Sequence, residues 1–102
     1  MFASVMTAKG QISRDDAKRV IDQMLPPAQS VPGFKGALFL VDEKASKGMA
    51  IVFYENEEAA RASADERDRL RTDAASQVGA SISSVEGYEV LMASGVAELI
   101  QA

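Results

Sequence analysis

Arginine and tyrosine side chains are the groups of this sequence best suited to chemistry at a binding site. Four arginines fall within one stretch of helical pattern: Arg61, Arg67, Arg69 and Arg71. Most have an acidic residue three or four positions away, the spacing of ordinary surface ion pairs on a solvated helix face. Arg67 and Arg71 lie closest to the apolar stripe marked by Leu70 and Ala74. Turned inward, either guanidinium could hold an anionic or phenolate-like substrate.

The two tyrosines, Tyr54 and Tyr88, could donate hydrogen bonds into a pocket or act as acids. An ordinary tyrosine has a pKa of about 10, which makes it a poor base at neutral pH. Packing in a core or at an interface is the alternative role for both rings.

Cys, His and Trp are all absent from the 102 residues. Their absence excludes thiol nucleophiles, disulfides, zinc sites of the Cys/His type, a His-ligated haem and imidazole acid–base chemistry. The sequence therefore predicts no metal site and no cofactor, and its residue types identify no catalytic group.

The charge of the chain argues against two classes of partner. A formal net charge of −4 and a pI near 4.7 do not suit a nucleic-acid groove or an anionic membrane surface. The start, MFASVMTAKG, lacks the basic and apolar regions of a secretion signal, and no apolar run approaches the length of a membrane span. We therefore expect a cytoplasmic protein that binds neither nucleic acid nor membrane.

The first half of the chain predicts two strands and a helix that could position these side chains. Residues 2–8 form an apolar run typical of a strand. Ser13 stands where a helix N-cap is expected, and the helix should end by Leu25, because Pro26 and Pro27 disfavour helical backbone before them. The apolar run 37–41 predicts the next strand, and Gly48 is expected at the positive-φ position of the hairpin that follows.

The second half predicts two further strands and a long helix. Residues 49–54 complete the hairpin, and Asn56 is expected to cap a helix that extends towards Val78 and ends at Gly79. A break is expected near Ser63, where residues 63–66 (SADE) have the form of a capping box. The last strand is predicted at 85–93, with Gly95 opening a short tail.

The order strand, helix, strand, strand, helix, strand predicts a ferredoxin-like α+β fold, βαββαβ, with an antiparallel sheet in a single domain over residues 1–102. The strands at 37–41 and 49–54 are apolar on both faces. Because the helices cover only one face of such a sheet, the other face needs its own cover. We therefore expect a homodimer through the helix-free sheet face.

The second helix presents mainly alanines to the sheet, so the layer between them is expected to be underfilled. An apolar cavity there would bind a small apolar or aromatic ligand. Core filling is the alternative role for the methionines and phenylalanines of this layer. The candidate substrate-binding residues are Met6, Phe39, Phe53, Tyr54, Arg67, Leu70, Arg71 and Tyr88.

Four stretches, which together span most of the chain, resemble the antibiotic biosynthesis monooxygenase (ABM) domain family. They are residues 32–37 (PGFKGA), the hairpin at 42–48, residues 54–59 (YENEEA) and residues 85–90 (VEGYEV). The resemblance implies a dimeric α/β barrel, in which the sheets of two ferredoxin-like protomers pack together. Members of the family include cofactor-independent monooxygenases of polyketide aromatics, quinol monooxygenases and haem-degrading enzymes.

The catalytic residues of the family are not carried over by this resemblance. Enzymatic members commonly use combinations of Asn, Trp, His and Arg, whereas this sequence has no Trp or His. Its one asparagine, Asn56, stands at a predicted helix cap. The absence of His also argues against a haem-degrading role.

Three functions of different classes remain open. The first is a cofactor-independent monooxygenase acting on a small aromatic or quinol-type substrate, in which the deprotonated substrate itself reacts with oxygen. The second is a non-catalytic homodimer that binds a small molecule. The third is a structural or stress-related homodimer without a ligand, for which a filled layer beneath the helices would be the distinguishing feature.

Overall fold

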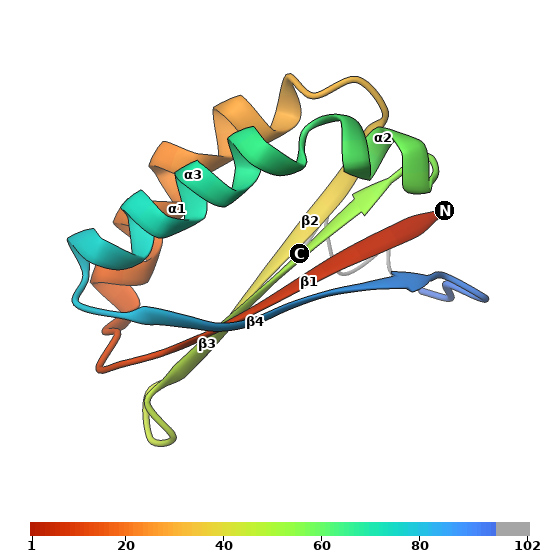
Figure 1. Ribbon diagram of the computed structural model, residues 1–102. Helices are drawn as coiled ribbons and strands as arrows, with labels where there is room; N and C mark the ends of the chain where they lie inside the picture. Colours follow the sequence, from red (N-terminus) through yellow and green to blue (C-terminus); the bar gives the residue numbers. More distant parts are fainter. Residues whose placement is uncertain (96–102) are drawn as a thin grey trace.

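A four-stranded antiparallel sheet is covered on one face by helices in the computed structural model of the protein (Figure 1). The structure describes residues 1–95, so the end of the predicted domain and the tail after Gly95 lie outside the described residues. The elements in chain order are β1 (Phe2–Lys9), α1 (Arg14–Gln29), β2 (Phe34–Asp42), β3 (Lys47–Tyr54), α2 (Glu57–Ala62), α3 (Ala64–Gln77) and β4 (Ser81–Glu89). The strand order is β2-β3-β1-β4, which confirms the predicted ferredoxin-like α+β fold.

Strand β1 lies inside the sheet and pairs with β3 on one side and β4 on the other. Ser4 is paired with Val52 of β3 and with Gly87 of β4. Because side chains alternate between the two faces of a strand, Ser4 and Met6 point toward the helices, whereas Ala3 and Val5 point away from them.

Helix α1 begins as predicted and ends later than predicted. The Ser13 hydroxyl accepts a hydrogen bond from the backbone N–H of Asp16 at 3.1 Å, which confirms the N-cap. The expected end at Leu25 is wrong, because the helix continues through Pro26 and Pro27 to Gln29. The backbone N–H of Ser30 donates to the carbonyl of Pro26 at 3.2 Å, so the final turn closes after the prolines.

Packing against the sheet explains why the helix tolerates two prolines. Each proline removes one helical hydrogen bond. Pro27 and Ala28 line a cavity next to the sheet, and the Ser30 hydroxyl donates to the Pro27 carbonyl at 2.7 Å. These contacts offset the lost hydrogen bonds, as tertiary context commonly overrides local propensity.

The β2–β3 hairpin forms as predicted, but its positive-φ residue is Ser46, with φ of 54°, and not Gly48. Asp42 pairs with Lys47, so the connection is residues 43–46 and its last position adopts the left-handed conformation. Gly48 already belongs to strand β3, two residues past that position. The Asp42 carboxylate stabilises the turn by accepting from the backbone N–H of Ala45 at 3.1 Å.

The break in the second helical segment is confirmed at Ser63, which separates α2 from α3. The Asn56 side chain accepts from the N–H of Ala59 at 2.9 Å, which confirms its capping role. The capping box at residues 63–66 is wrong, because the Ser63 side chain makes no cap hydrogen bond and instead accepts from the side chain of Arg67. Gly79 follows the end of α3 with φ of 69°, as expected for a helix terminator.

The last strand, predicted at 85–93, occupies Ser81–Glu89 instead. Its limits follow those of its partner, because Lys9 pairs with Ser81 and Phe2 pairs with Glu89. The start of this strand contains no apolar run, because Ile82 stands among the serines at positions 81, 83 and 84. Among the helices that the structure describes, none is long and apolar enough to cross a membrane.

Candidate functional site

A cavity of about 40 Å³ lies between α1, α3 and the sheet, and we call it the arginine cavity. Six of the eight predicted ligand-binding residues line it: Met6, Phe39, Tyr54, Arg67, Leu70 and Arg71. The remaining wall comes mainly from α1 and the segment after it, through Met24, Pro27, Ala28 and Val31.

The other two predicted residues, Phe53 and Tyr88, do not line this cavity. Phe53 directly precedes Tyr54 in β3, so strand alternation directs its side chain to the helix-free face. Tyr88 pairs with Ala3, is 51% exposed, and donates from its hydroxyl to the Glu86 carboxylate at 2.7 Å. The structure therefore separates these two residues from the other six.

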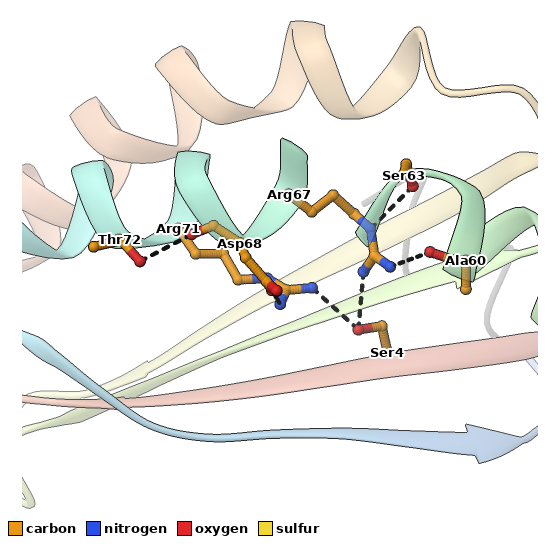
Figure 2. Close-up of polar contacts among 7 residues, drawn as sticks. All are labelled: Ser4, Ala60, Ser63, Arg67, Asp68, Arg71 and Thr72. Carbon is orange, nitrogen blue, oxygen red and sulfur yellow. Dashed lines mark hydrogen bonds and ion pairs between the residues drawn. The ribbon is translucent and has the colours of Figure 1, made fainter. Parts of the chain in front are cut away.

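Two arginines from α3 converge on one serine hydroxyl of β1 (Figure 2). The Ser4 Oγ atom accepts from Nη1 of Arg67 at 3.1 Å and from Nη2 of Arg71 at 3.2 Å. Arg67 also donates to the Ser63 hydroxyl at 3.1 Å and to the carbonyl of Ala60. These contacts fix both guanidinium groups between the helices and the sheet.

Arg71 is a buried cation, with only 6% of its surface exposed. Its Nη1 atom lies 2.8 Å from Oδ1 of Asp68, a carboxylate that is itself well exposed. Burial lowers the pKa of Arg71, and the like charge of Arg67 lowers it further, while Asp68 and Tyr54 oppose the shift. The surroundings of Arg71 therefore compensate its buried positive charge only in part.

Tyr54 is fully buried, and its ring lies beneath Arg67, whose guanidinium carbon is 4.9 Å from the ring centre. Its hydroxyl has no hydrogen-bond partner among the residues that the structure describes. Burial raises the pKa of Tyr54, although the charges of Arg67 and Arg71 oppose the shift, as does the nearby Ser63 hydroxyl, which favours the ionised oxygen but does not meet the geometry of a hydrogen bond to the neutral hydroxyl. A buried donor without a partner costs about 1–3 kcal/mol, so such a group calls for an explanation.

Together Arg67, Arg71 and Tyr54 give one part of this cavity a positive charge and a phenolic hydroxyl. Arg67, Arg71 and Tyr54 all line this cavity, and the Tyr54 hydroxyl has no hydrogen-bond partner among the described residues, while the exposed Glu66 borders the same cavity. Charge-assisted hydrogen bonds from arginine to an oxyanion are stronger than those between neutral groups. The geometry suits a ligand with an ionised oxygen.

A second cavity, of about 80 Å³, adjoins the first, and we call it the apolar cavity. It lies between α1, the end of α3 and the part of the sheet nearest the β2–β3 hairpin. Five residues border both cavities: Met6, Met24, Phe39, Ala50 and Arg71. The layer beneath the helices is therefore incompletely filled. A structural protein without a ligand was expected to have this layer filled, so the two cavities argue against that function.

Sequence reasoning missed Ser4, Ser63 and the α1 wall of the arginine cavity. Ser4 could have been found, because it is a lone hydroxyl at a helix-facing position between apolar strand residues. The α1 wall was hidden by the expectation that this helix ends before Pro26.

Comparison with known proteins identifies the fold. No protein-family model matches the sequence, and no curated protein matches it.

SnoaB, a cofactor-independent oxygenase from Streptomyces nogalater, superposes with a TM-score of 0.70 at 13% identity, over 90% of this chain and 94% of that one. A candidate antibiotic biosynthesis monooxygenase from Deinococcus radiodurans gives 0.63 at 17% identity, over 92% and 96% of the two chains. A similar candidate from Bordetella bronchiseptica gives 0.65 at 15% identity, over 89% and 97%. The chain has the ABM-type fold that its sequence resembles.

Proposed function

We propose that this protein, which has the fold of the ABM structures, is a cofactor-independent oxygenase that acts on a small aromatic or quinol-type substrate in the arginine cavity. The observation that carries the proposal is the buried Tyr54 hydroxyl, which has no hydrogen-bond partner among residues 1–95 and lies beside two arginine side chains. The fold shared with SnoaB, itself described as a cofactor-independent oxygenase, supports the reaction class.

The residues of the cavity suit the stabilisation of a substrate anion. An ionised substrate oxygen at this position would accept from the Tyr54 hydroxyl and interact with Arg67 and Arg71. Because its pKa is raised, Tyr54 keeps its proton at neutral pH and acts as a donor, not as a base. Preorganised donors and charges of this kind favour the anion over the neutral substrate.

The anion would then react with dioxygen directly. For a substrate with an activated methylene group, water takes up the first proton, and the electron pair left on carbon reduces dioxygen. One oxygen atom stays on that carbon as a carbonyl group, and the other leaves as water together with the two hydrogens of the methylene group. The protein contributes orientation and anion stabilisation.

Oxygen consumption tests the proposal. The purified protein is incubated with a panel of small phenols, quinols and activated-methylene aromatics in the presence of a metal chelator. We expect turnover that survives the chelator and falls about 100-fold in Tyr54→Phe, the loss typical of removing one anion-stabilising donor. Tyr88→Phe is the matched control, because this exposed tyrosine lies on the other sheet face, and it should leave the rate unchanged.

Two results would contradict the proposal. Activity that disappears with the chelator would show that a metal takes part in the reaction. No oxygen consumption across the panel would instead favour the second function, a non-catalytic protein that binds small molecules in the same cavity.

A further inference from the structure

Neighbouring cavities of contrasting chemistry lie beneath the helices. The arginine cavity offers Arg67, Arg71 and the Tyr54 hydroxyl. Among the described residues that line the apolar cavity, Arg71 alone has a polar side chain, and it stands where the two cavities meet. A ligand that spans both cavities would therefore meet charge at one end and only hydrocarbon at the other.

The sizes of the cavities limit such a ligand. Space for one water-sized atom corresponds to roughly 10–15 Å³ on this scale. The arginine cavity, at about 40 Å³, takes roughly three non-hydrogen atoms, as in a carboxylate. The apolar cavity, at about 80 Å³, takes roughly five to eight, as in one benzene ring with a methyl group.

The side chains between the cavities can make room for a continuous ligand. Met6 and Met24 border both spaces. A thioether side chain is unbranched and changes rotamer easily, so methionine commonly lines adaptable binding sites. Rotation of these two side chains would join the cavities without moving a helix or a strand.

We infer that the ligand of this site is a single-ring aromatic molecule with one anionic oxygen group, held by Arg67, Arg71 and Tyr54, and an apolar opposite end in the apolar cavity. This inference rests on the proposed function, because it assigns the substrate class of the same site. It selects within the proposed substrates: a quinol with its second hydroxyl opposite the first would bury that hydroxyl where, apart from Arg71 at the junction, the described lining has no polar side chain to receive it. Polycyclic aromatics exceed the available space.

Binding of three matched probes tests this inference without turnover, by calorimetry at neutral pH under anaerobic conditions. 4-Methylbenzoate has the proposed form, 4-hydroxybenzoate replaces its methyl group with a hydroxyl, and 4-methylbenzamide replaces its carboxylate with a neutral amide. We expect 4-methylbenzoate to bind at least tenfold more tightly than either analogue. Equal or tighter binding of 4-hydroxybenzoate or 4-methylbenzamide, or no binding of 4-methylbenzoate, would overturn the inference.

A cavity-filling variant locates the apolar end of the ligand. Ala75 borders the apolar cavity and not the arginine cavity, so Ala75→Leu should weaken 4-methylbenzoate at least tenfold. Ser76→Leu is the matched control, because it adds similar bulk at an exposed neighbouring position outside both cavities, and it should leave affinity unchanged. Equal affinity of the two variants would overturn the placement.

A second measurement keeps the test independent of how the variants fold. In native protein with ¹³C-labelled methionine methyl groups, 4-methylbenzoate should shift the resonances of Met6 and Met24 and leave that of the exposed Met92 in place. Unchanged Met6 and Met24 resonances at saturating probe would overturn the inference. Tight 4-methylbenzoate binding without oxygen consumption by any substrate of this form would contradict only the oxygenase proposal.

Discussion

The guanidinium of Arg67 stacks over the ring of Tyr54, with 4.9 Å between the guanidinium carbon and the ring centre. The same guanidinium bonds to Ser4 of β1, to Ser63 and to the carbonyl of Ala60. One side chain therefore connects α2, α3 and two strands, while it also holds the Tyr54 ring against the cavity. The pair therefore links the stability of the fold to the proposed ligand site.

Replacing Arg67 with lysine should destabilise the protein, because a lysine has no planar group to stack on Tyr54 and no fork of donors to reach three acceptors at once. We expect a loss of about 1–3 kcal/mol in the free energy of unfolding, measured by urea denaturation. Arg69→Lys, at an exposed position of the same helix, is the control and should change stability by less than about 0.5 kcal/mol. Equal effects at the two positions would contradict the importance of the stacked arrangement.

Tyr54→Phe should separate stability from function. Removing a buried hydroxyl for which the described part of the chain offers no partner should leave the free energy of unfolding unchanged or raise it by about 1 kcal/mol. Denaturant unfolding of native and variant protein measures this difference. A loss of more than about 1 kcal/mol would mean that the hydroxyl has a stabilising partner in the native protein.

The two tyrosines permit a direct titration of each ring, because the chain has only two. In Tyr88→Phe the tyrosinate absorbance reports Tyr54 alone, and in Tyr54→Phe it reports Tyr88 alone. Burial raises the pKa of Tyr54, and the hydrogen bond to Glu86 raises the pKa of Tyr88, so both midpoints should lie above the ordinary value of about 10. A Tyr54 midpoint at or below that value would contradict its burial.

The raised pKa of Tyr54 also predicts a pH dependence of stability. The folded protein holds this proton more tightly than the unfolded chain does. The resulting stabilisation is therefore complete below about pH 10 and is lost as the pH rises through the pKa of the folded state. Between these two pKa values, Tyr54→Phe should lose stability less steeply than native protein in urea melts. Parallel pH profiles would contradict this linkage.

Gly33 should not tolerate a side chain, because its φ of +88° is unfavourable for other residues and a Cβ there would lie 2.7 Å from Cβ of Ala59. Its carbonyl also accepts from the N–H of Glu55 at 2.7 Å, which holds the start of α2 against this turn. We expect Gly33→Ala to cost about 1–3 kcal/mol in denaturant unfolding. Gly36→Ala is the control, since no atom lies within 4 Å of its added Cβ, and a similar loss there would refute the steric explanation.

We propose that two copies of the chain associate through the helix-free sheet face, which is formed by Val5, Leu38, Leu40, Met49, Ile51 and Phe53. These residues follow from the strand register and alternation, and Ile51 stands between Leu38 and Val5. A specific interface of this kind buries about 1,200 Å² or more in total. The native protein should therefore sediment as a dimer at micromolar concentration.

Ile51→Lys should dissociate this dimer, because it places an unpaired ammonium group at the centre of the apolar face. Gln23→Lys, on the exposed side of α1, is the charge-matched control and should remain dimeric. A monomeric native protein that stays well folded would overturn the proposal.

Patterns that repeat along the chain were readable from the sequence, whereas features that depend on a distant partner were not. The order of strands and helices follows from apolar periodicity, and the caps at Ser13 and Asn56 follow from local hydrogen bonding. The passage of α1 through Pro26 depends on packing against the sheet, and the limits of β4 depend on the length of β1.

In the candidate site, too, the contacts between residues far apart in the sequence could not be predicted. Arg67 and Arg71 could be singled out, because they border an apolar stripe. Their common acceptor, Ser4, is more than 60 positions away in the sequence and becomes their neighbour only through the fold. Phe53 and Tyr88 do not line the arginine cavity. Alternation along the strand places Phe53 and Tyr54 on opposite faces, but because both faces of this strand are apolar, the sequence does not reveal which face the helices cover.

The inner position of β1 bears on how the protein is made. Of the four strands of this sheet β1 is synthesised first, and it must wait for both of its partners, because β3 and β4 follow it by many residues. Until β4 has been synthesised, one edge of β1 has no partner, and such edges associate readily with other chains. A nascent chain that stalls before residue 81 would hold Ser4, Arg67 and Arg71 without a complete sheet beneath them, so a truncated product should be an aggregation hazard and not a partially active protein.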